Sequence, residues 1–128
     1  VDTALARGVE RILPELKDKL STQAFRVPTV NVSVMDLSLT VKKVCKAEEI
    51  NKVIQKAASV LPENVLGTND QPLASCDFNH DPRSGIVDLN QTAVAGKNLI
   101  KLVVWFDNEW AYANRMLDVA QYISRLKD

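Results

Sequence analysis

The residue best suited to bind an anion is Arg26, which lies between Phe25 and Val27 and just before Pro28. A guanidinium group is always charged, and its paired N–H donors match the oxygens of a phosphate or a carboxylate. Three interpretations stay open from the residues alone: the side chain lies along a sheet surface, pairs with a carboxylate such as Asp36, or binds an anion. Pattern alone favours the structural interpretations, because most surface arginines bind no ligand.

A second candidate is the run Asp107-Asn108-Glu109-Trp110, which separates a long apolar segment from an amphipathic one. The place where a strand ends and a helix begins favours ligands, because the first N–H groups of a helix have no partner within it. The same pattern is typical of a capping turn, in which the Asp107 carboxylate accepts those N–H groups. On pattern alone we expect the capping turn.

The segment around His80, the only histidine, could support acid–base or metal chemistry. If this segment is a strand, His80 and Cys76 share a face but lie about 13 Å apart, too far for proton transfer. Asp77 and Asp81 imitate the start of a calcium loop, but Pro82 stands where such a loop needs glycine. We therefore expect no metal site and a loop role for both carboxylates.

Composition is that of a soluble globular domain. The chain has 128 residues, 16 Lys+Arg and 16 Asp+Glu, so its formal net charge is zero. Neutral charge argues against a partner such as nucleic acid, and no apolar run is long enough to cross a membrane. The widely spaced Cys45 and Cys76 are typical of reduced, partly buried thiols in a cytoplasmic protein. Because the chain begins with Val1, we expect it to come from a longer polypeptide.

Apolar residues at helical spacing predict three helices. The first runs from Leu5 to about Leu13, because Pro14 removes a backbone donor there. The second covers residues 47–58, and the third follows Asp107, which can cap it.

Period-two alternation predicts a half-buried strand over 32–42, in which Met35, Leu37 and Leu39 face one way. Residues 61–72 are predicted to be a loop. The other predicted strands are 23–27, 73–78, 85–89, 92–95 and 99–106. The last two form a hairpin, and 99–106 should be central because it is apolar on both faces. Since strands follow one another without a helix between each pair, the fold class is α+β with a mainly antiparallel sheet.

Three motifs occur in an order that resembles a known family. They are Phe25-Arg26-Val27-Pro28-Thr29 and its continuation to Leu37, Ser84-Gly85-Ile86-Val87-Asp88, and the run from Trp105 to Met116. Together they resemble the phosphorylating glyceraldehyde-3-phosphate dehydrogenase family over essentially the whole chain. Segments 8–15 and 77–82 look more like the erythrose-4-phosphate dehydrogenase branch, whereas Ala24-Phe25-Arg26 is closer to the glyceraldehyde-phosphate branch. The first branch is favoured.

The resemblance implies a domain arrangement. Residues 1–106 correspond to an incomplete catalytic domain with helices on one face of its sheet. Residues 107–128 correspond to a C-terminal helix that packs on an NAD-binding domain outside this sequence. No residue here matches the family's nucleophilic cysteine or its histidine base, so this chain alone is expected to be inactive.

The resemblance also implies roles for individual residues. Arg26 corresponds to an arginine that binds substrate or inorganic phosphate, and Thr3 to a threonine of a second phosphate site. Asn108 corresponds to the asparagine that hydrogen-bonds the nicotinamide carboxamide of NAD, and Tyr112 lines the same pocket. No metal ligand is implied.

The implied function is that of an NAD-dependent oxidoreductase that converts D-erythrose 4-phosphate to 4-phosphoerythronate. The alternative within the family is a phosphorylating glyceraldehyde-3-phosphate dehydrogenase, and the alternative from another class is a non-catalytic binding or assembly module. The resemblance also implies that the full-length enzyme is a homotetramer and that its small-molecule partner is the phosphorylated aldehyde. It implies no binding to nucleic acid or to a membrane.

Overall fold

Five strands form one mixed sheet within residues 5–126, the part of the chain that the computed structural model describes. The strands are β1 (Ser33–Thr40), β2 (Leu66–Asn69), β3 (Gly85–Asp88), β4 (Ala93–Ala95) and β5 (Leu99–Phe106). Their order is β1-β5-β3-β2, and β4 also pairs with β5. Only β2 and β3 run parallel. The α+β class is confirmed, and the parallel pair makes the sheet mixed.

The helices are α1 (Leu5–Ile12), α2 (Ala47–Val60) and α3 (Asn108–Arg125), joined by the short 3₁₀ helices η1 (Pro14–Leu16), η2 (Ser75–Phe78) and η3 (Leu89–Gln91). The three α-helices lie where the sequence predicts them. Helix α1 ends before Pro14, and α2 begins where the Lys46 N–H donates to Glu49 Oε2 at 2.9 Å.

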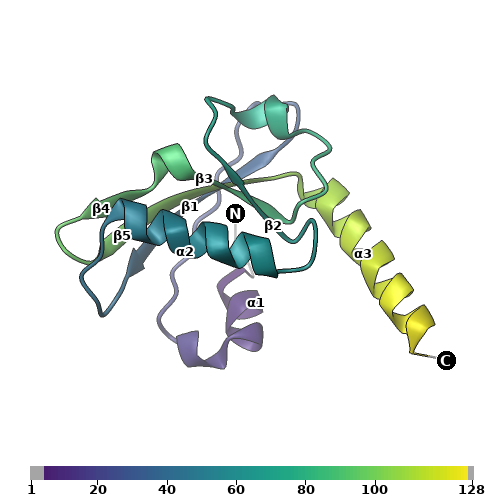
Figure 1. The fold of residues 1–128 in the computed structure, drawn as a ribbon, viewed down its shortest axis with the longest axis horizontal. Helices are drawn as coiled ribbons and strands as arrows, with labels where there is room; N and C mark the ends of the chain where they lie inside the picture. Colours follow the sequence, from purple (N-terminus) through teal and green to yellow (C-terminus); the bar gives the residue numbers. More distant parts are fainter. Residues whose placement is uncertain (1–4, 127–128) are drawn as a thin grey trace.

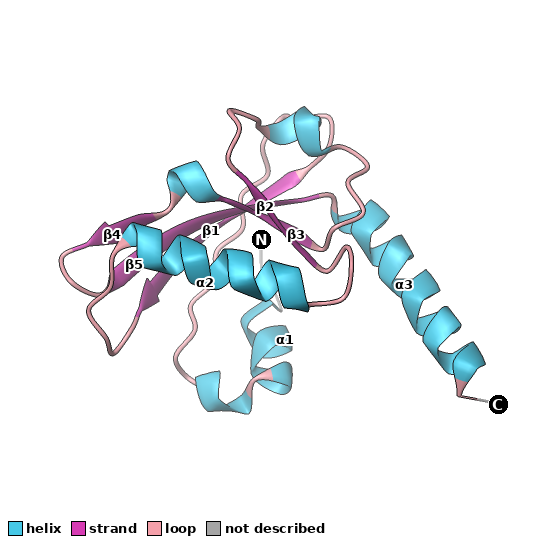
Figure 2. Ribbon diagram, viewed as in Figure 1, coloured by secondary structure: helices cyan, strands magenta, loops and turns pink. Residues whose placement is uncertain are grey.

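The helices differ in how they meet the sheet (Figure 1). Helix α2 lies across the strands and packs chiefly against β2. Helix α3 leaves the end of β5 and extends away from the strands, as Figure 2 shows. Most of its large apolar side chains are exposed, and within residues 5–126 only Ala111 of this helix is buried.

Strand β5 is the central strand, as its apolar faces predicted. It pairs antiparallel with β1 from Thr40↔Leu99 to Ser33↔Phe106, and also with β3 and β4. The predicted hairpin of β4 and β5 is confirmed. The buried apolar core of the described residues lies on and beside these strands and consists of Phe78, Ile86, Val87, Ile100 and Ala111.

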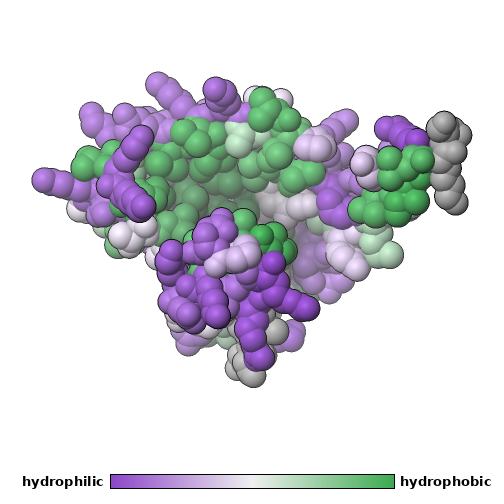
Figure 3. Space-filling view, turned by 90° about the horizontal axis from the view of Figure 1, so that it is seen from below, coloured by the Kyte–Doolittle hydropathy of each residue, from purple (hydrophilic) through white to green (hydrophobic). Residues whose placement is uncertain are grey.

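The two faces of β1 differ in character, as the alternation predicted. Met35 is opposite Val104 and is half-buried, which places an apolar face on that side. On the other face Asp36 pairs with Lys101 at 2.5 Å. Seen from below, the molecule has a hollowed surface where apolar side chains gather (Figure 3). Leu39, at the end of β1, remains exposed.

The predicted strand over 23–27 is wrong. Residues 19–28 form no helix or strand, and Phe25 and Val27 are exposed. The chain turns sharply at Pro28, because the Thr29 N–H donates to the carbonyl of Val27 at 2.8 Å. A strand needs a neighbour to complete its hydrogen bonds, and the nearest apolar run, β1, pairs with β5 instead.

The prediction for 61–78 is also wrong in two places. Residues 73–78 are not a strand, since the chain turns at Pro72 and continues into η2, where Asp77 Oδ2 accepts from the Ala74 N–H at 2.8 Å. The predicted loop over 61–72 contains β2, whose sequence Leu-Gly-Thr-Asn does not alternate apolar with polar residues, although its burial alternates along the strand. Strand β2 forms because β3 supplies its partner groups.

No helix within residues 5–126 combines the length and hydropathy needed to cross a bilayer.

Candidate ligand site at the start of the C-terminal helix

Asp107 lies at the junction of β5 and α3, and its side chain is 1% exposed. Its Oδ1 accepts from the Trp110 N–H at 3.1 Å, which confirms the predicted N-cap. Its Oδ2 accepts from the His80 N–H at 2.9 Å and from Asn31 Nδ2 at 2.8 Å. One carboxylate therefore joins three segments that are far apart in the sequence.

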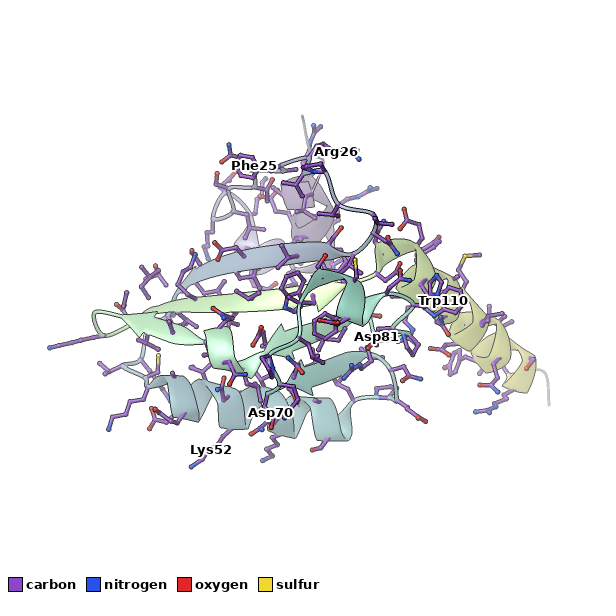
Figure 4. The ribbon with its side chains drawn as sticks, turned by 90° about the horizontal axis from the view of Figure 1, so that it is seen from above. Phe25, Arg26, Lys52, Asp70, Asp81 and Trp110 are labelled. Atoms are coloured by element: carbon purple, nitrogen blue, oxygen red, sulfur yellow. The ribbon has the colours of Figure 1, made fainter. Side chains whose placement is uncertain are left out.

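Side-chain contacts reinforce this junction. Asn31 Nδ2 also donates to Asn79 Oδ1 at 2.6 Å, and the His80 and Trp110 rings lie 4.5 Å apart between centroids. Figure 4 shows Trp110 at the start of α3 beside the loop that carries Asp81. We call this cluster the Asp107 junction: Asn31, Asn79, His80, Asp107 and Trp110.

One residue of the Asp107 junction, and the neighbour of another, have left-handed backbone conformations. His80 has a φ of 58°, and Val32, the neighbour of Asn31, has a φ of 72°. Such a conformation is costly for a β-branched residue and persists only where surrounding contacts impose it. The hydrogen bonds to Asp107 supply such contacts.

Burial and hydrogen bonding act in opposite directions on the Asp107 carboxyl. Burial raises the pKa of Asp107, but the hydrogen bonds from the His80 and Trp110 N–H groups and from Asn31 lower it more. The resulting pKa lies below the usual value, so Asp107 is ionised at neutral pH. A charged acceptor strengthens all three hydrogen bonds.

A half-buried ion pair shapes the loop before β3. Arg83 donates to Asp81 through Nε at 2.9 Å and through Nη2 at 2.6 Å. The hydrogen bond from the Arg83 side chain is the main reason that the pKa of Asp81 is lowered, and desolvation opposes it. The guanidinium lies close against Gly67 of β2, where a Cβ would come within 2.4 Å of Nη1. A larger residue at this position would therefore require the Arg83 side chain to move.

Acid should weaken the fold through these two carboxyl groups. The pKa values of Asp81 and Asp107 are lowered in the folded chain. The two carboxylates therefore stabilise the fold fully at a pH above 3.8, the pKa of these groups in the unfolded chain. This stabilisation is lost as the pH falls through the folded values. We expect the unfolding free energy from urea titrations to drop as the pH falls below about 4.

The matched variants are Asp107→Asn and Asp70→Asn, since Asp70 is exposed. We expect Asp107→Asn to destabilise the chain at pH 7 and to converge on the wild-type curve in acid, where both side chains are neutral. Asp70→Asn should follow the wild type throughout. A constant gap between Asp107→Asn and wild type at every pH would contradict the role of the charge.

Arg115 provides α3 with a second attachment. Its Nη1 donates to the carbonyl of Asn64 and to Ser84 Oγ, and its Nη2 pairs with Asp118 at 2.8 Å. Asn64 and Ser84 are themselves joined by a backbone hydrogen bond of 3.1 Å. The direction of α3 is therefore set at its first residues and again two turns later.

Of the residues to which the resemblance assigns ligands, Asn108 directly follows Asp107, and Arg26 precedes Asn31 by five residues. Arg26 is exposed on the coil before Asn31 and pairs with no carboxylate within residues 5–126. The sequence alternative in which it pairs with Asp36 is wrong, because Asp36 pairs with Lys101. Thr3 lies outside the described residues.

The two residues assigned to NAD lie on α3. Asn108 is its first residue, directly after the capping Asp107, and Tyr112 follows one turn later; both side chains are exposed. An amide offers two donors and one acceptor, and a carboxamide offers the same groups in complementary positions. The residues present therefore fit a nicotinamide ring placed beside the start of α3.

The sequence patterns missed Asn31 and the backbone of His80. No local signal marks them, since their partner Asp107 is 76 and 27 residues away along the chain. Cys45 is half-buried and Cys76 is exposed, and both are free. The expectation that Cys76 is partly buried is wrong, because the residue lies on η2 rather than on a strand of the sheet.

Comparison with protein families agrees with this geometry. The family described as glyceraldehyde 3-phosphate dehydrogenase, C-terminal domain, matches residues 1–108, a segment that ends on the first residue of α3. The match covers the whole sheet and every residue of the Asp107 junction except Trp110, and it extends over more than half of the sequence. The chain therefore belongs to the glyceraldehyde-3-phosphate dehydrogenase family and forms its C-terminal domain.

Proposed function

We propose that this chain is part of an NAD-dependent dehydrogenase that oxidises D-erythrose 4-phosphate to 4-phosphoerythronate. Family membership implies the dehydrogenase class. The observation that carries the proposal is the charged, exposed Arg26, on a segment that Asn31 ties to the start of α3. The erythrose substrate is supported by the resemblance of segments 8–15 and 77–82 to that branch.

Arg26 would hold the phosphate of the substrate. Its guanidinium has no ion-pair partner among residues 5–126, so its donors can meet two phosphate oxygens without first breaking a bond in the protein. Thr3 would contribute to a second phosphate site. A site that recognises one small anion with one or two side chains needs no basic surface, in agreement with the zero net charge.

Asn108 and Tyr112 would hold the nicotinamide end of NAD. Asn108 orients the carboxamide by hydrogen bonds, and the Tyr112 ring, one turn further along α3, shields the same side. When bound, NAD supplies the acceptor for the hydride of the aldehyde. The nucleophilic cysteine and the base would come from another part of the complete enzyme.

The exposed apolar side chains of α3 support the proposed domain arrangement. Residues 1–106 would form part of the catalytic domain, and 107–128 would pack against a nucleotide-binding domain. A groove along α3 offers the necessary apolar surface, and its lining residues are Tyr112, Arg115, Met116, Val119, Ala120 and Ile123. We propose that the complete enzyme is a homotetramer, as is usual in the family.

One observation favours a second candidate function. The run Ala24-Phe25-Arg26 is closer to the glyceraldehyde-phosphate branch, in which inorganic phosphate releases the acyl product. The two substrates differ by one carbon and both carry a terminal phosphate, so Arg26 would serve either one.

The deciding experiment assays NADH formation by the complete enzyme with each phosphorylated aldehyde. We expect D-erythrose 4-phosphate to be oxidised without added inorganic phosphate, and unphosphorylated erythrose to be a poor substrate. Faster oxidation of glyceraldehyde 3-phosphate that depends on inorganic phosphate would favour the second candidate. No NADH with either aldehyde would contradict both and support a non-catalytic assembly module.

A further inference from the structure

The Asp107 junction connects two segments that the proposed function assigns to different ligands: the segment of Arg26 to the substrate phosphate and the start of α3 to the nicotinamide. Arg26 precedes Asn31 by five residues, a span of at most about 18 Å. Asn108 directly follows Asp107. The contact between Asn31 Nδ2 and Asp107 Oδ2, at 2.8 Å, is therefore a direct bond between the phosphate-binding segment and the nicotinamide-binding helix.

Both oxygens of the Asp107 carboxylate are used by hydrogen bonds within the protein. Asp107 is 1% exposed, and its two oxygens accept three hydrogen bonds, of which only the one from Trp110 belongs to the capping of α3. A capping aspartate needs no partner beyond its own helix. The bonds from Asn31 and from the His80 N–H thus serve a purpose other than starting the helix.

The loops are held in conformations that they would not adopt alone. Val32 and His80 both have left-handed φ values, of 72° and 58°, and each lies beside or at a donor to Asp107. Release of these hydrogen bonds would let both loops relax toward ordinary conformations. The position of Arg26 relative to Asn108 therefore depends on the Asp107 carboxylate.

We propose that Asp107 is a positioning residue that fixes the distance between the phosphate site at Arg26 and the nicotinamide contact at Asn108, with Asn31 as its link to the phosphate side. This inference rests on the proposed function. Correct placement of two reactants lowers the entropic cost of their reaction, so a small displacement costs binding and rate. Asp107 itself touches neither ligand.

Three variants of the complete enzyme test this role. Asp107→Asn keeps one oxygen for the Trp110 N–H, but the –NH2 group that replaces Oδ2 can accept from neither the His80 N–H nor Asn31 Nδ2. We expect the KM for the phosphorylated aldehyde and the KM for NAD each to rise on the order of tenfold. Asn31→Ala is milder, since Asp107 keeps both backbone donors. It should raise the KM for the aldehyde by about threefold to tenfold and leave the KM for NAD within about twofold.

The matched control is Asp88→Asn. Asp88 is 5% exposed and accepts from the Asn90 N–H at 3.1 Å and from Trp105 Nε1 at 3.4 Å, but it contacts neither ligand segment. A purely structural loss lowers the amount of active enzyme, and hence the apparent kcat, without changing either KM. We expect this pattern for Asp88→Asn.

The results distinguish the positioning role of Asp107 from the proposed dehydrogenase function. If Asp107→Asn lowers the melting temperature but leaves both KM values within about twofold of wild type, the positioning role is wrong while the proposed function stands. If Asn31→Ala shifts neither KM, Asn31 is not the link, and the inference fails in that form. A wild-type enzyme that forms no NADH with either aldehyde overturns the proposed function, and the positioning role with it.

Discussion

Replacing Arg26 by alanine in the complete enzyme should raise the KM for the phosphorylated aldehyde by roughly 30- to 100-fold, the loss expected for a two-donor contact to a charged phosphate. The KM for NAD should be unchanged, because the proposed nicotinamide contacts lie on α3. The melting temperature should also be unchanged, since Arg26 is exposed and makes no ion pair within residues 5–126. Steady-state kinetics with each substrate varied in turn measure all of this.

Two further variants control the Arg26 result. Arg26→Lys keeps the charge but loses the planar pair of donors, so we expect an intermediate KM. Arg11→Ala removes an exposed arginine of α1 and should have the wild-type KM. Substrate kinetics of Arg26→Ala that match the wild type would refute the phosphate role.

The largest loss of stability is expected for Phe78→Ala. Phe78 is 2% exposed and stacks on Trp105 of β5, with ring centroids 5.7 Å apart and planes at 16°. Removal of a buried ring leaves a cavity beside the central strand, and we expect the unfolding free energy to fall by about 3–5 kcal/mol. Urea denaturation of the chain measures this change.

The control for the buried ring is the same substitution at an exposed one. Phe25 is 76% exposed, so Phe25→Ala should change the unfolding free energy by less than about 0.5 kcal/mol. The Asp81 N–H donates to the backbone carbonyl of residue 78, a bond that the substitution leaves intact, so the loss measures the buried ring itself. Equal effects of the two substitutions would show that burial and stacking of the Phe78 ring do not stabilise the fold.

Strong local periodicity was a sound guide to the elements. The alternation in β1, the long apolar run of β5 and the helical spacing of α1 and α2 predicted their type and nearly their limits. Each of these segments presents one continuous apolar face or is apolar throughout, and the period of that pattern differs between a helix and a strand, so it indicates the type of element. The Asp107 cap was also predictable, because it involves only residues that are neighbours in sequence.

Short segments were not predictable in this way. Residues 23–27 and 73–78 are as apolar as many strands, yet each lies beside a proline at which the chain turns. The residue types of strand β2 do not alternate between apolar and polar, and its backbone partner is β3. In such segments the partner that completes the backbone hydrogen bonds decides the conformation, and local composition does not specify that partner.

The sequence by itself determined the α+β class, the central position of β5, the capped start of α3 and the motifs that indicate the family. The tertiary structure alone decided that Asn31, His80 and Asp107 meet at one carboxylate. It also left Arg26 exposed and without an ion pair among residues 5–126, on a coil where a strand was expected. The physical reason is that these hydrogen bonds join residues far apart along the chain, so they depend on the register of β1 and β5 and on the path of the loops, which local spacing does not encode.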